Sequence, residues 1–212
     1  MAELILYGYP QSNYVRAARM ACVEKGVPHT LEPVRPHSPA ILEINPFGRM
    51  PAMRHGDFTL YETSAIMRYI DDSFDGPRLT PTDKRQRAKM EQWMSAINAY
   101  YDNAIMRRLV LQYIFPSGAD GKPDRAIVDK AAEEVKKQIA ILDTALVPGP
   151  YLLGADISLA DLLLCPIMVY LSQTPEGGEI LKTTKNIPRA GQMISARKSY
   201  LETVPPPPPP RA

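Results

Sequence analysis

Apolar residues recur at helical spacing along two long stretches in the second half of the chain. One series runs from Met90 to Leu109 and the other from Ile127 to Leu146, each stepping by three or four residues. Neither stretch contains proline, which helix interiors exclude because proline lacks an N–H and clashes with the preceding turn. The proline-free segments span residues 82–115 and 124–147. We therefore predict a long helix in each segment and an all-helical organisation after about residue 82.

The first 81 residues carry shorter apolar runs that are separated by turn signals. The expected strands cover residues 4–7, 27–34, 51–53 and 58–61, and the expected helices cover residues 12–25, 38–44 and 63–74. The resulting order is βαβ followed by αββα. A strand–helix–strand crossover implies a parallel pair and a hairpin adds antiparallel strands, so we predict a mixed α/β sheet with helices on both faces.

Composition excludes several classes of function. The net charge is +2 over 212 residues, which gives no electrostatic support for nucleic-acid binding. The longest apolar run, residues 159–171, is shorter than the roughly 20 residues that span a bilayer, so we expect no membrane insertion. Cys22 and Cys165 stand far apart in apolar surroundings and no signal-peptide pattern is visible, which together favour a cytoplasmic protein. The histidines lack metal-ligand spacing, so we expect no metal.

Proline is the residue type in excess. The chain has 22 prolines, about twice the usual share of ~5%. Six of them stand together as Pro205 to Pro210, for which we predict a disordered polyproline tail. From these shifts in composition we expect a first domain over residues 1–78, a linker over 79–83, an all-helical domain over 84–202 and a tail over 203–212.

Ser12 lies where a predicted strand gives way to a predicted helix. The simplest interpretation is an N-cap serine whose hydroxyl accepts a hydrogen bond from an orphan backbone N–H. The same position also suits chemistry, because a hydroxyl beside unpaired amides at the positive end of a helix favours a small anion such as a thiolate. No histidine lies nearby in sequence to act as a base, so the residues do not indicate a serine hydrolase.

Met50 and Pro51 belong to a proline-rich loop that enters a predicted strand. A plain connecting loop is the simplest interpretation. If the Met50–Pro51 peptide bond is cis, however, the chain turns sharply and leaves the Met50 backbone N–H and C=O free to pair with an extended peptide.

Glu62 and Thr63 precede a predicted helix, and the simplest interpretation of the pair is a helix start. A functional interpretation exists as well. A hydroxyl and free helix amides can bind a carboxylate, and the Glu62 carboxylate can bind an ammonium group. The two charges together match the head group of an α-amino acid.

Two other features are interpreted as structural. Ser158 and Asp161 have the spacing of a capping box ahead of a strongly apolar helix. The first long predicted helix carries several aromatic residues, which we expect in a core or an interface, with some lining a cleft.

Four motifs in this order resemble those of the cytosolic glutathione S-transferases, and the resemblance extends over residues 3–200. The motifs are Tyr-Gly-Tyr-Pro-Gln-Ser at 7–12, Asn-Pro-Phe-Gly-Arg-Met-Pro-Ala at 45–52, Glu-Thr-Ser-Ala-Ile at 62–66 and Ser-Leu-Ala-Asp at 158–161. The position of the serine is similar to that of the phi and theta-like classes, and we expect a bacterial source.

The resemblance implies a thioredoxin-like N-terminal domain, an all-helical C-terminal domain and a homodimer. It assigns thiol activation to Ser12, with Tyr7 and Tyr9 as rival donors. Glutathione is the implied co-substrate, and the residues implied to bind it are His37, Arg49, Met50, Pro51, Glu62 and Thr63. The residues implied to line a pocket for a small hydrophobic electrophile are Tyr9, Tyr101, Met106, Tyr113 and Phe115.

The implied activity is conjugation of glutathione to hydrophobic electrophiles, as in detoxification. Two alternatives stay open. One is a glutathione-dependent peroxidase or isomerase that shares the glutathione site and differs in the second substrate. The other is a non-catalytic protein of the same fold that binds glutathione or another ligand.

Overall fold

The computed structural model describes residues 2–207 and divides the chain into two units. One unit comprises the residues up to Thr80 together with those from Ser195 onward, and the other comprises residues 81–194. The first unit contains the sheet and the second is entirely helical, which confirms the predicted fold class.

A four-stranded mixed sheet forms the centre of the first unit, in the order β2-β1-β3-β4. The strands are β1 (Leu4–Tyr7), β2 (His29–Glu32), β3 (Ala52–His55) and β4 (Phe58–Tyr61). β1 pairs with β2 in parallel, whereas the pairs β1–β3 and β3–β4 are antiparallel. The order of elements, βαβ followed by αββα, is as predicted.

Two strands have different bounds from those expected. β2 is shorter than the expected 27–34 segment. The hairpin turn was expected to span residues 54–57, but Arg54 and His55 continue β3 and pair with β4. The turn is therefore Gly56-Asp57 alone, and Gly56 supplies the positive φ of 63° that tight hairpin turns require.

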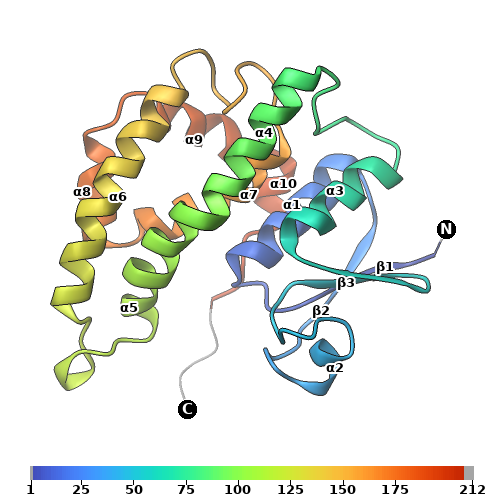
Figure 1. Ribbon diagram of the computed structural model, residues 1–212, viewed down its shortest axis with the longest axis horizontal. Coiled ribbons are helices and arrows are strands. Elements are labelled where there is room, and N and C mark those ends of the chain that lie inside the picture. Colours follow the sequence, from blue (N-terminus) through green and yellow to red (C-terminus); the bar gives the residue numbers. More distant parts are fainter. Residues whose placement is uncertain (1, 208–212) are drawn as a thin grey trace. The chain divides into compact units, whose positions relative to one another are not determined.

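Helices cover both faces of the sheet in the first unit (Figure 1). α1 (Asn13–Lys25) and α3 (Thr63–Ser73) lie on one face, and the short α2 (Pro39–Leu42) lies on the other. Tyr7 packs against Ile41 of α2, so the alternation along β1 places Leu4 and Leu6 on the opposite face, under α1 and α3. Both leucines are buried, which shows that one face of β1 contributes to the main core of this unit.

α1 is bounded by the signals that its sequence predicts. Ser12 is its N-cap, and its C-cap Gly26 adopts a left-handed conformation with φ 69°. At its C-terminal end, the Lys25 ammonium lies 3.2 Å from the Asp71 carboxylate of α3, and both side chains are almost fully buried. Asp71 also accepts a hydrogen bond from the backbone N–H of Leu79. This buried pair joins α1, α3 and the segment that leads out of the unit.

The second unit begins with a continuous helical stretch that matches the first long proline-free segment. It consists of α4 (Lys84–Ala96), a π-helical part η1 (Ile97–Val110) and α5 (Leu111–Ile114). The remaining elements are η2 (Ala119–Gly121), α6 (Arg125–Ala145), α7 (Leu159–Ser172), α8 (Pro175–Lys182) and α9 (Ile187–Ser195). None of these described helices is long and apolar enough to cross a membrane.

The apolar stripe of α6 differs by one position from the stripe predicted at its start. Ile127 is 37% exposed, whereas the neighbouring Val128 is fully buried. The rest of the stripe, from Ala131 to Leu146, is buried as expected. Ile127 lies in the first turn of α6, where fewer neighbours specify the direction of a side chain than in the middle of the helix.

The C-terminal residues belong to a different unit from the one expected. We expected the helical domain to extend to residue 202 and the tail to begin at 203, but the structure groups residues from Ser195 onward with the first unit. α10 (Lys198–Glu202) packs against α1, and Thr203 is fully buried. The expected disordered tail therefore has an ordered start, and its residues 208–212 lie outside the described part of the chain.

The capping box ahead of α7 has the predicted geometry. The Asp161 carboxylate accepts hydrogen bonds from the backbone N–H of Ser158 at 2.9 Å and from the Ser158 hydroxyl at 2.7 Å. It also accepts the backbone N–H of Leu152 at 2.8 Å, and all three groups are buried. Asp161 thus fastens the preceding loop to the first turn of α7.

Replacing Asp161 with alanine should lower the free energy of unfolding by about 3 kcal/mol, because it leaves two buried backbone N–H groups and a hydroxyl without their acceptor. Denaturant titration of the helical signal measures this loss. The exposed Asp156→Ala is the matched control and should change stability by less than about 0.5 kcal/mol. Equal stabilities for the two variants would contradict the structural role of Asp161.

Candidate active site

The strand register brings the sequence-predicted glutathione residues to one end of the sheet. Glu32, Tyr7, Ala52 and Tyr61 lie side by side across the four strands. The chain leaves the sheet after Glu32, after Tyr7 and after Tyr61, and it enters the sheet at Ala52. The segments that contain the predicted residues therefore all adjoin this row, although the first and the last of them are more than 50 residues apart in sequence.

Ser12 lies at the N-terminal end of α1 with its hydroxyl half-buried. The Ser12 Oγ accepts a hydrogen bond from the backbone N–H of Val15 at 3.4 Å. Its carbonyl accepts the backbone N–H of Arg16 at 2.9 Å. Because the hydroxyl oxygen acts as an acceptor here, its proton is left to donate to a bound anion at the positive end of the helix. The predicted N-cap role and the proposed chemical role are thus compatible in one geometry.

The rival donors Tyr7 and Tyr9 occupy different surroundings. Tyr7 packs against Ile41 and Ala52 on the α2 face of the sheet, and its phenol interacts with the Arg54 guanidinium. Tyr9 lies in the loop between β1 and α1, where its carbonyl accepts the backbone N–H of Ser12 at 3.0 Å. Tyr9 is therefore the nearer rival along the chain, and Tyr7 already has a partner.

The loop that contains Met50 has the backbone that the motif predicts, with a cis Met50–Pro51 peptide bond. Strand pairing of β3 begins at Ala52, so Met50 lies outside the ladders. The Met50 side chain reaches under the β1–α1 loop, and its sulfur accepts the backbone N–H of Tyr9 at 3.2 Å. Asn45, buried in the same loop, donates to the Arg49 carbonyl at 2.8 Å. The loop is thus fastened both to itself and to the segment that precedes Ser12.

Asn45 is a site residue that sequence reasoning left without a role. Its side-chain oxygen accepts the backbone N–H of Phe47 at 3.0 Å, and its carbonyl accepts that of Gly48 at 2.9 Å. An asparagine directly before proline is a turn signal, so the motif itself carried the information that could have identified it.

His37 and Arg49 lie close together beside this loop. The His37 backbone N–H donates to the Gly48 carbonyl at 2.9 Å, and the His37 ring lies against Gly48. A Cβ atom added at Gly48 would lie 2.2 Å from the His37 Nδ1 atom, so any other residue at this position would collide with the ring. Both His37 and Arg49 are exposed, so two groups able to bind a carboxylate face solvent here.

Glu62 and Thr63 begin α3 in an unusual backbone conformation. Glu62 has a φ of 70°, which is uncommon for a residue other than glycine. Its carboxylate is exposed and caps no amide of α3. Thr63 is buried in the first helical turn. The Glu62 side chain therefore stands beside the start of α3 without capping it.

The residues expected to line an electrophile pocket belong, apart from Tyr9, to the second unit. Tyr101 and Met106 are buried there, and the Tyr101 hydroxyl donates to the Gln138 carbonyl at 3.1 Å. Tyr113 donates to the Glu176 carboxylate at 2.6 Å. Phe115 is 72% exposed and makes the most accessible apolar surface of the four. Their assignment to a pocket stays a prediction.

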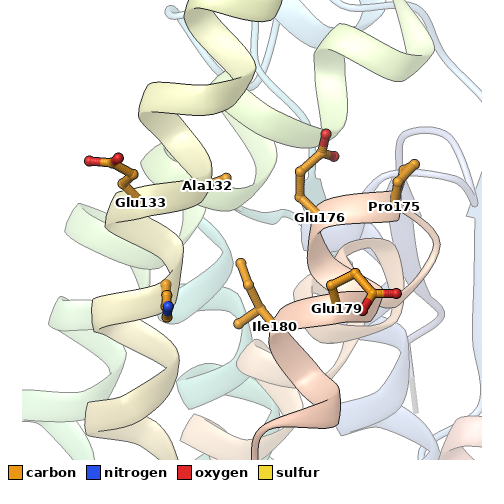
Figure 2. Close-up of a pocket in the computed structure, with 7 residues that line it drawn as sticks. Ala132, Glu133, Pro175, Glu176, Glu179 and Ile180 are labelled. Atoms are coloured by element: carbon orange, nitrogen blue, oxygen red, sulfur yellow. The ribbon is translucent and has the colours of Figure 1, made fainter.

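A pocket of about 450 Å³ opens on the second unit between α6 and α8, as Figure 2 shows. Ile180 points from α8 toward α6, whereas the carboxylates of Glu133 and Glu179 point away from it. None of the predicted site residues is among those that line this pocket. Tyr113 nevertheless adjoins it, because its hydroxyl donates to Glu176, which does line the pocket.

Two observations concern metal-ligating and thiol side chains among the described residues. They contain no group of three or more histidine, cysteine or carboxylate side chains that could hold a metal ion. Cys22 lies within α1, where burial raises the pKa of its thiol to about 12. A thiol of that pKa stays protonated at neutral pH, and the Cys22 side chain is buried in the core.

Comparisons with known proteins cover nearly the whole chain. The family described as "Glutathione S-transferase, N-terminal domain" matches residues 6–78, and that described as "Glutathione S-transferase, C-terminal domain" matches residues 101–193. Glutathione S-transferase 3 of Zea mays is 33% identical over 212 residues, which cover 96% of this chain and 94% of the maize protein.

Solved structures agree with these matches. Glutathione transferase F7 from Populus trichocarpa has a TM-score of 0.85 at 29% identity, and the match covers 94% of this chain and 97% of the poplar chain. A glutathione S-transferase-I bound with lactoylglutathione has a TM-score of 0.84 at 26% identity, with 95% and 98% covered. The maize and poplar relatives are plant proteins, so the expected bacterial source has no support from them. The chain belongs to the glutathione S-transferase family.

Proposed function

We propose that the protein conjugates glutathione to small hydrophobic electrophiles and that Ser12 activates the thiol. The proposal is supported by the row of strand residues that gathers the predicted glutathione positions at the N-terminal end of α1. The related transferase bound with lactoylglutathione supports glutathione as the co-substrate. A cytoplasmic location and a role in detoxification are part of the same proposal.

Activation of the thiol follows from the geometry of Ser12. A free thiol with a pKa of ~8.5 is only a few per cent ionised at neutral pH. A hydroxyl hydrogen bond and the positive end of α1 both favour the thiolate, and together they can lower the pKa by about two units, or roughly 2.7 kcal/mol. The thiolate then forms the new carbon–sulfur bond and the electrophile loses its leaving group. Positioning beside the sulfur is the remaining requirement for the electrophile.

The rest of the site suits the remainder of glutathione. Glu62 and the start of α3, with Thr63, are proposed to hold the γ-glutamyl ammonium and carboxylate. The Met50 backbone, set before the cis Pro51, is proposed to pair with the cysteinyl backbone. His37 and Arg49 are proposed to bind the glycine carboxylate. The charged ends of glutathione would thus meet groups of opposite charge or helix N–H groups, and its middle would pair through neutral main-chain hydrogen bonds.

We also propose that the protein forms a homodimer. Phe47, at the tip of the Asn45–Pro51 loop, is 64% exposed and its ring meets that of Tyr61 edge-on at 6.0 Å. An apolar side chain held this far out of a loop is typical of an interface anchor.

Replacing Ser12 with alanine should raise the pKa of the bound thiol by most of those roughly two units and lower conjugation at neutral pH about tenfold, because the thiolate loses its hydroxyl donor while the helix end remains. Glutathione affinity should stay within a few-fold of wild type. Titration of the thiolate absorbance together with an aryl-halide conjugation assay measures both effects.

Two further variants decide between the possible donors. Ser12→Thr keeps the hydroxyl and should restore most of the activity, whereas Tyr9→Phe should leave the thiol pKa unchanged. An unshifted pKa in Ser12→Ala combined with a raised pKa in Tyr9→Phe would assign activation to Tyr9. Retention on glutathione resin without turnover by wild type would favour the non-catalytic alternative, and turnover of peroxides alone would favour the peroxidase.

Replacing Glu62 with glutamine should weaken glutathione binding 10- to 100-fold, since a hydrogen bond to a charged group contributes about 1.5–3 kcal/mol. A glutathione analogue that lacks the γ-glutamyl amino group should bind wild type and Glu62→Gln with the same affinity, because it has no ammonium group to pair with the Glu62 carboxylate. Calorimetric titration measures both ligands. Glu3→Gln, at the opposite end of β1, is the control and should bind glutathione normally.

Replacing Phe47 with serine should shift the protein toward monomer in sedimentation experiments, because the anchor would lose its apolar contact. The control is Phe58→Ser, which removes a 43% exposed phenylalanine from the β3–β4 hairpin and should leave the mass unchanged. A wild-type protein that sediments as a monomer would contradict the dimer.

A further inference from the structure

One side of α1 is covered by the C-terminal strap, which we define as residues Arg197–Pro206. It contains α10, which lies beside α1 in the first unit (Figure 1). At the C-terminal end of α1, Glu24 receives two hydrogen bonds from the Arg197 guanidinium, at 2.6 and 2.7 Å, and one from the Ser199 hydroxyl at 2.5 Å. An ion pair between Arg197 and Glu24 therefore holds this end of the strap.

A second anchor lies near the other end of α1, where Arg16 is buried beneath the strap. Its guanidinium lies 4.6 Å from the centre of the Tyr200 ring. It donates hydrogen bonds to the Tyr200 carbonyl at 3.3 Å and to the Thr203 hydroxyl at 3.4 Å. Arg16 is only 3% exposed and these partners are uncharged.

The two anchors differ in what they contribute. The Glu24–Arg197 pair is a partly exposed ion pair between opposite charges. Arg16, by contrast, is a buried charge that faces a carbonyl, a hydroxyl and a ring. Burying a charge against neutral partners is costly, and an apolar side chain of similar length would fill the same space. Stability alone therefore does not account for an arginine at this position.

Arg16 is joined directly to Ser12 through the first turn of α1. The Arg16 backbone N–H donates to the Ser12 carbonyl at 2.9 Å, and that of Val15 donates to the Ser12 Oγ at 3.4 Å. On the other side of Ser12, the Gln11 side chain donates to the Pro206 carbonyl at 3.1 Å. The strap thus contacts the chain one residue before Ser12 and one turn after it.

We propose that Arg16 is a positioning residue and that, through it, the C-terminal strap fixes the orientation of the Ser12 hydroxyl. This inference rests on the proposed function of Ser12. The guanidinium fork holds the first turn of α1 to Tyr200 and Thr203, so the Ser12–Val15 turn cannot rotate independently. Since small displacements of a catalytic group have large effects on rate, loosening this anchor misdirects the hydroxyl without removing it.

The experiment compares three variants by the pKa of bound glutathione, read from thiolate absorbance, and by conjugation kinetics. Arg16→Met removes the fork at similar length, and Thr203→Val removes one acceptor while the Arg16 charge stays in place. Arg197→Met opens the strap at its far end and is the matched control. For Arg16→Met we expect a higher thiol pKa and a roughly tenfold lower kcat/KM. For Thr203→Val we expect a higher thiol pKa as well, with a kcat/KM that is about threefold lower. Arg197→Met should lose stability but keep the wild-type thiol pKa.

Several results would overturn the inference. An equal pKa shift in Arg197→Met would show general loosening of α1. A shift in Arg16→Met without one in Thr203→Val would show that the charge of Arg16 acts directly on the sulfur. If Arg16→Met does not fold, Thr203→Val alone decides, because valine matches threonine in shape. Ser12→Ala separates the two proposals. If this variant leaves the thiol pKa unchanged, the proposed function of Ser12 fails. If it raises the thiol pKa while the Arg16 and Thr203 variants do not, only the positioning role of Arg16 is refuted.

Discussion

Main-chain pairing across the four-stranded sheet is the constraint on which the candidate site depends. Tyr7 pairs with Glu32 on one side and with Ala52 on the other, and Ala52 pairs with Tyr61. A slip of one residue in any of these pairs would move a ligand-binding loop and turn the side chains of its strand to the other face. The buried side of β1, with Leu4 and Leu6, opposes such a slip because it would expose both leucines. Core packing therefore fixes the geometry of the site.

The position of α1 against the sheet determines where the Ser12 hydroxyl lies. Most of its residues are buried, with the sheet on one side, α3 beside it and α10 over the remaining face. Its far end is joined to α3 by the Lys25–Asp71 pair, which tolerates little movement because separating buried charges is costly. These contacts restrict movement of α1, so the residue at its start, Ser12, has a defined place relative to the neighbouring loops.

Much of this organisation could be predicted because local sequence signals and tertiary structure agree. Ser12 and Gly26 bound α1 as their capping preferences indicate, and the cis Met50–Pro51 bond follows the motif that contains it. Two features could not be predicted from local signals. The π-helical η1 left no trace in the apolar spacing, because its steps of four from Ile97 to Leu109 recur from Ile127 to Ile139 in the α-helical α6. The strap of Arg197–Pro206 left none, since its partners Gln11 and Arg16 are more than 180 residues away.

The long separation between α1 and its strap has a consequence for how the protein is made. Translation adds residues at roughly 5–20 per second, so α1 emerges from the ribosome roughly 10–40 seconds before the residues that cover it. The helical unit of residues 81–194 is continuous in sequence and is synthesised within that interval. During it, the buried arginine and the apolar side chains on that face of α1 remain open to water and to other chains. The nascent protein therefore passes through a stage in which its N-terminal unit is unfinished and vulnerable to misassociation, and a segment translated after the whole helical unit closes it.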